Sequence, residues 1–202
     1  MKNKIVFATG NAGKVKEIQM ILADMEMEVV TMTEEGIIID IEENGNSYEE
    51  NALIKAKAVA AFTDCIVMAD DSGLEVDYLG KEPGIHSARF LGEETPYAVK
   101  NAHIIKELEG VSDKDRTARF VCAIAAVLPD GRELTTRATI EGRIGYEEKG
   151  SNGFGYDPIF YVPEYDKTTA ELTEEEKNQI SHRGKALELM KEELKKYEGI
   201  GC

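Results

Sequence analysis

The chain lacks tryptophan and has little cysteine, proline or positive charge. Its 202 residues include three cysteines and five prolines, and 24 Lys and Arg stand against 39 Asp and Glu, a formal net charge of −15. Cys65, Cys122 and Cys202 form neither a C-x-x-C pair nor a zinc-binding spacing, and an odd number does not suit a complete set of disulfides. These features exclude a small disulfide-bonded scaffold and favour a reducing compartment.

The acidic excess and the absence of long apolar runs exclude further classes. A field of negative sign repels nucleic acids and anionic membranes. No apolar stretch approaches the roughly 18 residues of a membrane span, and residues 5–8 are too few for a signal peptide. The chain is 42% hydrophobic and 31% charged, which is typical of a folded globular protein. We expect a cytoplasmic protein that binds no nucleic acid and no membrane, so any polyphosphate partner is a small molecule.

Apolar runs alternate with helical periodicities along the chain. Strands are expected over residues 4–9, 28–32, 65–69, 117–128 and 133–144, with a hairpin turn at Pro129-Asp130-Gly131. Helices are expected after the glycine-rich turn at 10–13, after the pair Ser47 and Glu50, from Thr95-Pro96 to about 108, after Thr173, and from residue 181. Because no repeat or linker interrupts this order, we predict one α/β domain, residues 1–202, with a mixed sheet and flanking helices.

The segment Thr9-Gly10-Asn11-Ala12-Gly13-Lys14 lies where a strand is expected to pass into a helix. Backbone N–H groups and the helix dipole attract an anion at such a junction, and Lys14 adds positive charge. It is not a Walker A loop, because that motif would need glycine at Ala8 and a hydroxyl at Val15. A phosphate-binding turn and a turn whose glycines only permit tight packing are the two alternatives.

Asp70 and Asp71 end an apolar strand, where two carboxylates are costly unless they bind a cation such as a divalent metal. Successive strand residues point to opposite faces, so only one of the pair is expected to face a given site. We favour Asp71, which adjoins the expected turn at Ser72-Gly73. A solvated turn with an aspartate cap is the alternative.

The acidic stretch 40–46 has turn composition and is expected to be a mobile loop. Its Glu42 and Glu43 could complete a Mg²⁺ site, because Mg²⁺ takes one or two carboxylates together with substrate phosphates and water. Ordinary surface charge is the alternative.

Two later segments have features of a ligand site. An aromatic residue between glycines, in Gly153-Phe154-Gly155-Tyr156-Asp157-Pro158, can present its ring to a planar base, although Phe154 could equally fill the core. Ser181-His182-Arg183-Gly184-Lys185 places cations at a helix start, where the dipole disfavours them. A bound acceptor is therefore expected at this helix start.

The segments at 9–14, 153–158 and 181–183 resemble, in order and spacing, those of the inosine triphosphatase family of pyrophosphatases for non-standard purine nucleotides. The resemblance also includes Asp70-Asp71-Ser72-Gly73-Leu74, Pro83-Gly84 and Ser87-Ala88-Arg89-Phe90. The resemblance spans nearly the whole chain. It implies a long mixed sheet with two lobes around a central cleft, a homodimer, and hydrolysis of ITP, dITP or XTP to the monophosphate and pyrophosphate, which clears them from the nucleotide pool. The alternatives are a related pyrophosphatase of different base preference and a nucleotide-binding sensor that does not cleave.

The resemblance also implies a role for each matched position. Asp71 is implied as general base and metal ligand, with Mg²⁺ as cofactor and Glu42-Glu43 as the second metal-binding region, of which we favour Glu43. The implied substrate-binding positions are Thr9, Gly10, Asn11, Ala12, Gly13, Lys14, Lys55 and Ser72 and, for the base, Phe154, Gly155, Tyr156, Asp157, Lys177, His182 and Arg183. A donor from His182 or Arg183 to a 6-oxo group would reject adenine, which carries an amino donor there.

Overall fold

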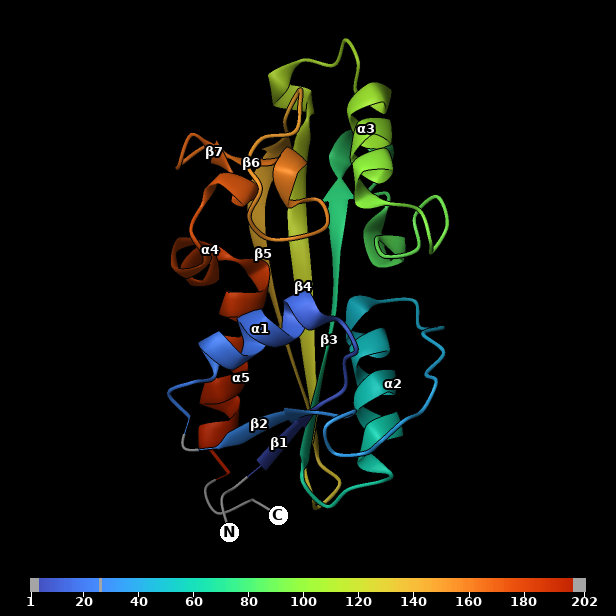
Figure 1. Ribbon diagram of the computed structural model, residues 1–202, viewed down its shortest axis with the longest axis vertical. Coiled ribbons are helices and arrows are strands. Elements are labelled where there is room, and N and C mark those ends of the chain that lie inside the picture. The colour runs from blue at the N-terminus through green and yellow to red at the C-terminus, as the bar shows by residue number, and fades with distance from the viewer. Residues whose placement is uncertain (1–3, 26, 198–202) are drawn as a thin grey trace. The chain divides into compact units, whose positions relative to one another are not determined.

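The computed structural model describes residues 4–25 and 27–197 (Figure 1). The strands are β1 (Lys4–Phe7), β2 (Glu28–Thr31), β3 (Ile66–Val76), β4 (Thr117–Val127), β5 (Glu133–Ile144), β6 (Phe160–Val162) and β7 (Lys167–Thr168). The α-helices are α1 (Ala12–Ile21), α2 (Tyr48–Ala60), α3 (Tyr97–Glu107), α4 (Glu174–Ile180) and α5 (His182–Lys195), and short 3₁₀ helices lie at Asp77–Leu79, Gly84–His86, Asp113–Asp115, Asp157–Ile159 and Thr169–Glu171. None of the helices in these ranges has the length and apolar character needed to cross a membrane.

The seven strands belong to one mixed sheet with the order β2-β1-β3-β4-β5-β6-β7. β1 pairs in parallel with β2 and β3, whereas β6 pairs antiparallel with β5 and β7. β4 and β5 are neighbours joined by a tight turn, in which the N–H of Leu128 donates to the carbonyl of Arg132. The predicted α/β class, the mixed sheet with flanking helices and the hairpin are confirmed.

The chain divides into two compact units. The first unit comprises Met1–Asp71, Cys122–Ala138 and His182–Cys202, and the second comprises Ser72–Val121 and Thr139–Ser181. The boundaries fall inside β3, β4 and β5, so each of these strands contributes residues to both units. Asp71 is consequently the last β3 residue of the first unit, and Ser72 is the first residue of the second.

The first unit buries apolar side chains on both faces of its strands. In β1, Ile5 and Phe7 pack in one cluster with residues of α1 and α5, whereas Val6 packs in another with residues of α2. This division follows from the alternation of side chains along a strand. Figure 1 shows α1 and α5 side by side, and the two helices are in contact. A strand buried on both faces has a continuous apolar sequence, which is why β1 could be predicted.

The second unit has an apolar core of its own. Leu74, Ile104 and Ile144 are fully buried in it. The rings of Phe120 and Phe160 pack in a tilted arrangement with their centroids 4.4 Å apart. Each unit therefore has buried apolar side chains of its own.

Two expected boundaries are wrong. β3 does not end at the acidic pair but continues from Ile66 to Val76, so Asp70-Asp71-Ser72-Gly73 is strand rather than turn. The strand can pass through the pair because cationic side chains of the helices compensate both carboxylates. Helix α3 begins at Tyr97 with Pro96 at its N-cap, because the hydroxyl of Thr95 donates to the carbonyl of Leu91 instead of capping the helix.

The cysteines differ in state. Cys122 is free and buried, whereas Cys65 is disulfide-bonded. Cys202 lies outside the described residues. Because Cys65 is disulfide-bonded, the cysteine content no longer supports the expected reducing compartment.

Candidate functional site

Asp70 and Asp71 are neighbours in β3 and point to opposite faces of the strand, as predicted. On the face covered by α1 and α5, Lys14 Nζ lies 2.9 Å from Asp70 Oδ2 and Arg183 Nη2 lies 3.3 Å from the same oxygen. Arg183 Nη1 also binds Glu17. Burial disfavours ionisation of Asp70, but the charges of Lys14 and Arg183 outweigh it and hold the pKa of this carboxyl well below its usual range. Asp70 is an ionised anchor for two cations.

Asp71 faces α2 instead. Its Oδ2 accepts a hydrogen bond of 3.1 Å from Asn51 Nδ2, and its Oδ1 lies 3.9 Å from Lys55 Nζ. Burial raises the pKa of Asp71 above 3.8 even though Lys55 and Asn51 oppose the rise, and the negative charge of Glu43 adds to it. Asp71 is thus more basic than an exposed aspartate while it remains close to a cation.

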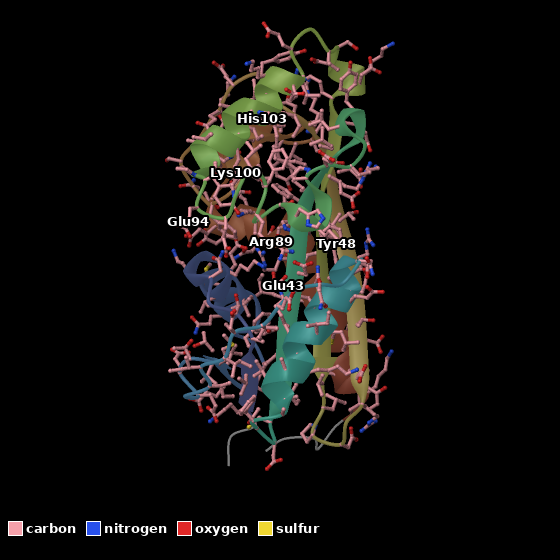
Figure 2. All side chains as sticks on the ribbon, turned by 90° about the vertical axis from the view of Figure 1, so that its right-hand side faces the viewer. Glu43, Tyr48, Arg89, Glu94, Lys100 and His103 are labelled. Atoms are coloured by element: carbon pink, nitrogen blue, oxygen red, sulfur yellow. The ribbon has the colours of Figure 1, made fainter. Side chains whose placement is uncertain are left out.

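The loop before α2 brings Glu43 to the same lysine. Glu43 Oε2 lies 3.0 Å from Lys55 Nζ, and Figure 2 labels Glu43 together with Tyr48, the first residue of α2. The N–H of Gly45 donates a 2.8 Å hydrogen bond to Asn51 Oδ1. The loop expected to be mobile is therefore attached to α2 by an ion pair and by a hydrogen bond to a helix side chain.

Two carboxylates of this region are suited to a metal ion. Asp71 and Glu43 both approach Lys55, whereas Glu42 is exposed. Within residues 4–25 and 27–197, no group of three or more His, Cys, Asp or Glu is arranged to hold a metal. A pair of oxygen ligands fits Mg²⁺, which keeps several waters and takes its other ligands from substrate phosphates. Glu43 and Asp71 thus share Lys55 as a partner, and the preference for Glu43 as the second metal ligand stays a prediction.

The turn before α1 is organised as a helix N-terminus. Asn11 is the N-cap, with its Oδ1 accepting a 3.2 Å hydrogen bond from the N–H of Lys14. Thr9 Oγ1 accepts from the N–H of Asn11 at 3.2 Å. The remaining members of the predicted turn are the exposed Gly10 and the first two helical residues, Ala12 and Gly13. A helix N-terminus beside a lysine is an arrangement that can stabilise a phosphate, so phosphate binding at this turn stays a prediction.

In the second unit, one buried carboxylate organises the loop around Phe154. Asp157 Oδ2 accepts hydrogen bonds from the N–H of Phe154 at 2.8 Å and from Lys177 Nζ at 2.7 Å, and its Oδ1 accepts from the hydroxyl of Thr169 at 2.7 Å. The Lys177 ammonium lies 5.1 Å from the centroid of the Phe154 ring. Gly153 has a φ of +74°, and a Cβ there would lie 2.2 Å from Asp157 Oδ2, so the turn requires glycine.

Tyr156 points into the core of the second unit. Its hydroxyl donates to the carbonyl of Ser87 at 2.8 Å, and its ring meets Tyr97 edge-on at 5.2 Å. Burial raises the pKa of this phenol, so it stays protonated. Tyr156 thus attaches the loop to the core of the second unit, whereas the Phe154 side chain is only half-buried.

His182 and Arg183 begin α5 and are buried in the first unit. The cations at this helix start predicted a bound acceptor, and the acceptors of Arg183 include the carboxylates of Asp70 and Glu17. The position of Arg183 is therefore explained in part by the chain's own acids.

Comparison with known proteins assigns the chain to a family. The model of the Ham1 family matches residues 5–193. The chain belongs to the Ham1 family. This confirms the resemblance found in the sequence. The dITP/XTP pyrophosphatase of Clostridium perfringens is 48% identical over 95% of this chain and 97% of its own length, and that of Desulforamulus reducens is 52% identical over 91% and 92%. A Ham1 protein structure from Coxiella burnetii superposes with a TM-score of 0.86 at 42% identity, covering 96% of this chain and 99% of that one.

The site of this Ham1 chain includes residues that sequence reasoning missed. Asn51 precedes Lys55 by four residues in α2, and Glu17 follows Lys14 by three in α1. These spacings place each pair on one helix face, which is the signal that could have found them. Thr169 carried no comparable signal, because its partner Asp157 lies in a separate segment.

Proposed function

We propose that this Ham1 protein is a Mg²⁺-dependent pyrophosphatase that hydrolyses ITP, dITP and XTP to the nucleoside monophosphate and pyrophosphate. Relatives about half identical over most of the chain are named dITP/XTP pyrophosphatases. The observation that carries the proposal is the cluster of Asp71, Glu43 and Lys55, together with Lys14, whose charge also acts on the pKa of Asp71. Removal of these nucleotides from the pool is the role that follows.

The first unit is proposed to bind the triphosphate. Lys14 and Lys55 are paired with carboxylates in the substrate-free protein, and phosphate oxygens would compete for the same ammonium groups. Thr9 and Asn11 hold the helix N-terminus that receives a phosphate. Asp71 and Glu43 would hold Mg²⁺, which supplies neutralisation of the phosphate charge and polarisation of the phosphorus when bound.

Asp71 is the proposed general base. The oxygen of a water molecule bonds to the α phosphorus while one water proton passes to the Asp71 carboxylate. The bond from the α phosphorus to the oxygen that bridges to the β phosphorus breaks, and pyrophosphate leaves with that electron pair. Lys14 and Lys55 stabilise the negative charge that develops.

The second unit is proposed to recognise the base. The Phe154 ring, over which the Lys177 ammonium lies, offers a stacking surface for the base. The resemblance gives His182 or Arg183 as the donor to the 6-oxo group of hypoxanthine or xanthine. Because Arg183 pairs with Asp70 and Glu17, we propose Lys177 as this donor instead. Adenine has an amino group at that position, so two donors would oppose each other. Gly155, Tyr156 and Asp157 shape the loop. Ser72, His182 and Arg183 are assigned to further substrate contacts on the basis of the family resemblance.

We further infer a homodimer that acts in the cytoplasm, as the resemblance implies. The net charge of −15 repels nucleic acids, which suits an enzyme that acts on free nucleotides. Light scattering after gel filtration measures the assembly directly: a mass of twice the 22.4 kDa chain supports the dimer, and the chain mass contradicts it.

A panel of nucleoside triphosphates tests the activity. ITP, dITP, XTP, ATP, GTP, dCTP and dTTP are incubated with the protein in Mg²⁺ or in EDTA, and products are identified by mass spectrometry. We expect pyrophosphate and monophosphate from ITP, dITP and XTP in Mg²⁺ alone. Preference for another base would favour the related pyrophosphatase, and binding without any release would favour a sensor.

A further inference from the structure

Asn51 joins the two acidic parts of the proposed metal site. Its side chain is fully buried in α2. Its Oδ1 accepts the 2.8 Å hydrogen bond from the N–H of Gly45, in the loop that carries Glu43, and its Nδ2 donates the 3.1 Å hydrogen bond to Asp71 Oδ2. One amide therefore contacts both the loop and the β3 carboxylate.

The chemistry of the two contacts requires an amide. A backbone N–H on one side needs an acceptor, and a carboxylate on the other side needs a donor, and asparagine carries both on one rigid group. An aspartate would oppose its oxygen to Asp71, and a leucine would leave the N–H of Gly45 without this acceptor. Asparagine at position 51 therefore supplies both the acceptor for the N–H of Gly45 and the donor to Asp71.

Close packing at Gly45 makes the contact specific. A Cβ at Gly45 would lie 2.8 Å from Asn51 Oδ1 and 2.8 Å from the Cβ of Glu50, both closer than such atoms normally approach. Since α2 begins at Tyr48 and is capped by Ser47, whose hydroxyl oxygen accepts from the N–H of Glu50, the helix gives the loop a fixed support. The loop can lie against Asn51 only because residue 45 has no side chain.

We propose that Asn51 is a positioning residue that holds the Glu43 loop and the Asp71 carboxylate in one arrangement, so that both can bind the same divalent cation. The proposal rests on the proposed function for its catalytic consequence. Asn51 itself touches neither the reacting atoms nor the cation. Its effect passes through Asp71 on one side and through the backbone of Gly45 on the other.

The main test is Asn51→Leu, which removes both hydrogen bonds at similar volume and adds no charge. Affinity for Mn²⁺ alone is measured by electron paramagnetic resonance on the substrate-free protein, and kcat and KM for dITP are measured at saturating metal. Loss of a hydrogen-bond partner of a metal ligand typically costs about 10- to 100-fold in metal affinity or activity, and we expect losses of this size in Mn²⁺ affinity and in kcat. The KM for dITP should stay close to that of the wild type, because the lysines that bind phosphate remain. Mn²⁺ affinity and kcat close to those of the wild type would overturn the proposal.

Asn101→Leu is the matched control. Asn101 is also buried, and its amide donates to Glu148 at 2.7 Å in the second unit. This variant carries the general cost of replacing a buried amide, so its melting temperature should fall while its Mn²⁺ affinity stays unchanged. An equal loss of Mn²⁺ affinity in both variants would mean that destabilisation alone explains the effect, and the proposal would be overturned.

Gly45→Ala changes the contact between the Glu43 loop and Asn51 from the side of the loop. It tests the role of Asn51 if the Asn51→Leu variant does not fold. The added methyl displaces the loop, whereas the hydrogen bond from Asn51 to Asp71 can persist. We expect Mn²⁺ affinity to fall about tenfold, with kcat at saturating metal less affected than in Asn51→Leu. Wild-type Mn²⁺ affinity in Gly45→Ala would overturn the proposal. If the wild-type protein released no pyrophosphate, the proposed function would fail, while these Mn²⁺ affinities would still decide the role of Asn51.

Discussion

The two units hold their cations in different ways. In the first unit, Lys14 and Lys55 pair with carboxylates that also contact other groups, and their side chains are 17% and 11% exposed. In the second unit, Lys177 pairs with the buried Asp157, and the lysine side chain is only 7% exposed, with its ammonium over the Phe154 ring. The first arrangement suits lysines that exchange partners with a charged substrate. The second suits a rigid support for a neutral base.

The largest expected effect comes from removing the base in the first unit. In Asp71→Asn the amide can neither accept the water proton nor supply a carboxylate to Mg²⁺, so kcat for dITP should fall by at least about 100- to 10,000-fold, the usual contribution of a general base alone. Binding of dITP should largely survive, because Lys14 and Lys55 are untouched. Steady-state kinetics and calorimetric binding measure the two quantities. Turnover close to that of the wild type would remove Asp71 from the mechanism.

Removing the cation of the second unit should affect stability as well as specificity. Lys177→Met leaves the buried Asp157 without its cationic partner, which typically costs about 3–5 kcal/mol in the free energy of unfolding. The preference for dITP over dATP should also narrow. Urea denaturation and the two kcat/KM values provide the measurements. The double variant Lys177→Met with Asp157→Asn should regain part of the stability, and a stable single variant would show that the pair is not held as described.

Removing a cation of the first unit should affect affinity without affecting specificity. In Lys14→Met, Asp70 keeps Arg183, so the fold should survive. A hydrogen bond to a charged group is worth about 1.5–3 kcal/mol, so kcat/KM should fall by about 10- to 100-fold. The fall should be equal for dITP and dATP, because their triphosphates are identical. A changed ratio of the two kcat/KM values would contradict the assignment of Lys14 to phosphate.

Replacing the Phe154 ring in the second unit should have the smallest kinetic effect. Phe154→Leu keeps an apolar side chain but removes the stacking surface, which is worth about 1–3 kcal/mol per base. We expect the KM for dITP to rise by about tenfold on that scale, with the same change for dATP since both purines stack. Comparison of the two KM values is the test, and an unchanged KM would favour a core-filling role for Phe154.

The neighbouring acids of the first unit should titrate apart in the metal-free protein. Burial raises the pKa of Asp71 above 3.8, whereas Lys14 and Arg183 overcome burial and lower that of Asp70. The free energy of unfolding therefore falls as pH rises through the raised pKa of Asp71, because the buried carboxyl ionises. The contribution of Asp70 to stability is lost only as pH falls through its lowered pKa, because the carboxylate is then protonated. Carbon NMR of the two carboxyl groups measures both values. Coincident titrations would contradict the separation of the two faces.

Sequence reasoning located the residues with distinctive chemistry but not the contacts that join them. Lys14 and Phe154 belong to local patterns of turn and glycine pair that survive in the structure, whereas the strand end expected beside Asp71 does not, because β3 continues to Val76. The continuation of β3 could not be predicted, because carboxylates in a strand are stable only with partners from elsewhere. Arg183 lies 113 positions from Asp70 along the chain, and only the folded arrangement brings them together.

The alternation of Asp70 and Asp71 along β3 has a consequence for how this protein can change. Deleting or inserting a single residue just before the pair would send each acid to the opposite layer and exchange their helical neighbours. The apolar positions of β3 can accept substitutions of similar volume, but the spacing between them and the acids is fixed. Length variation during evolution is therefore expected in the surface turns and not in this strand.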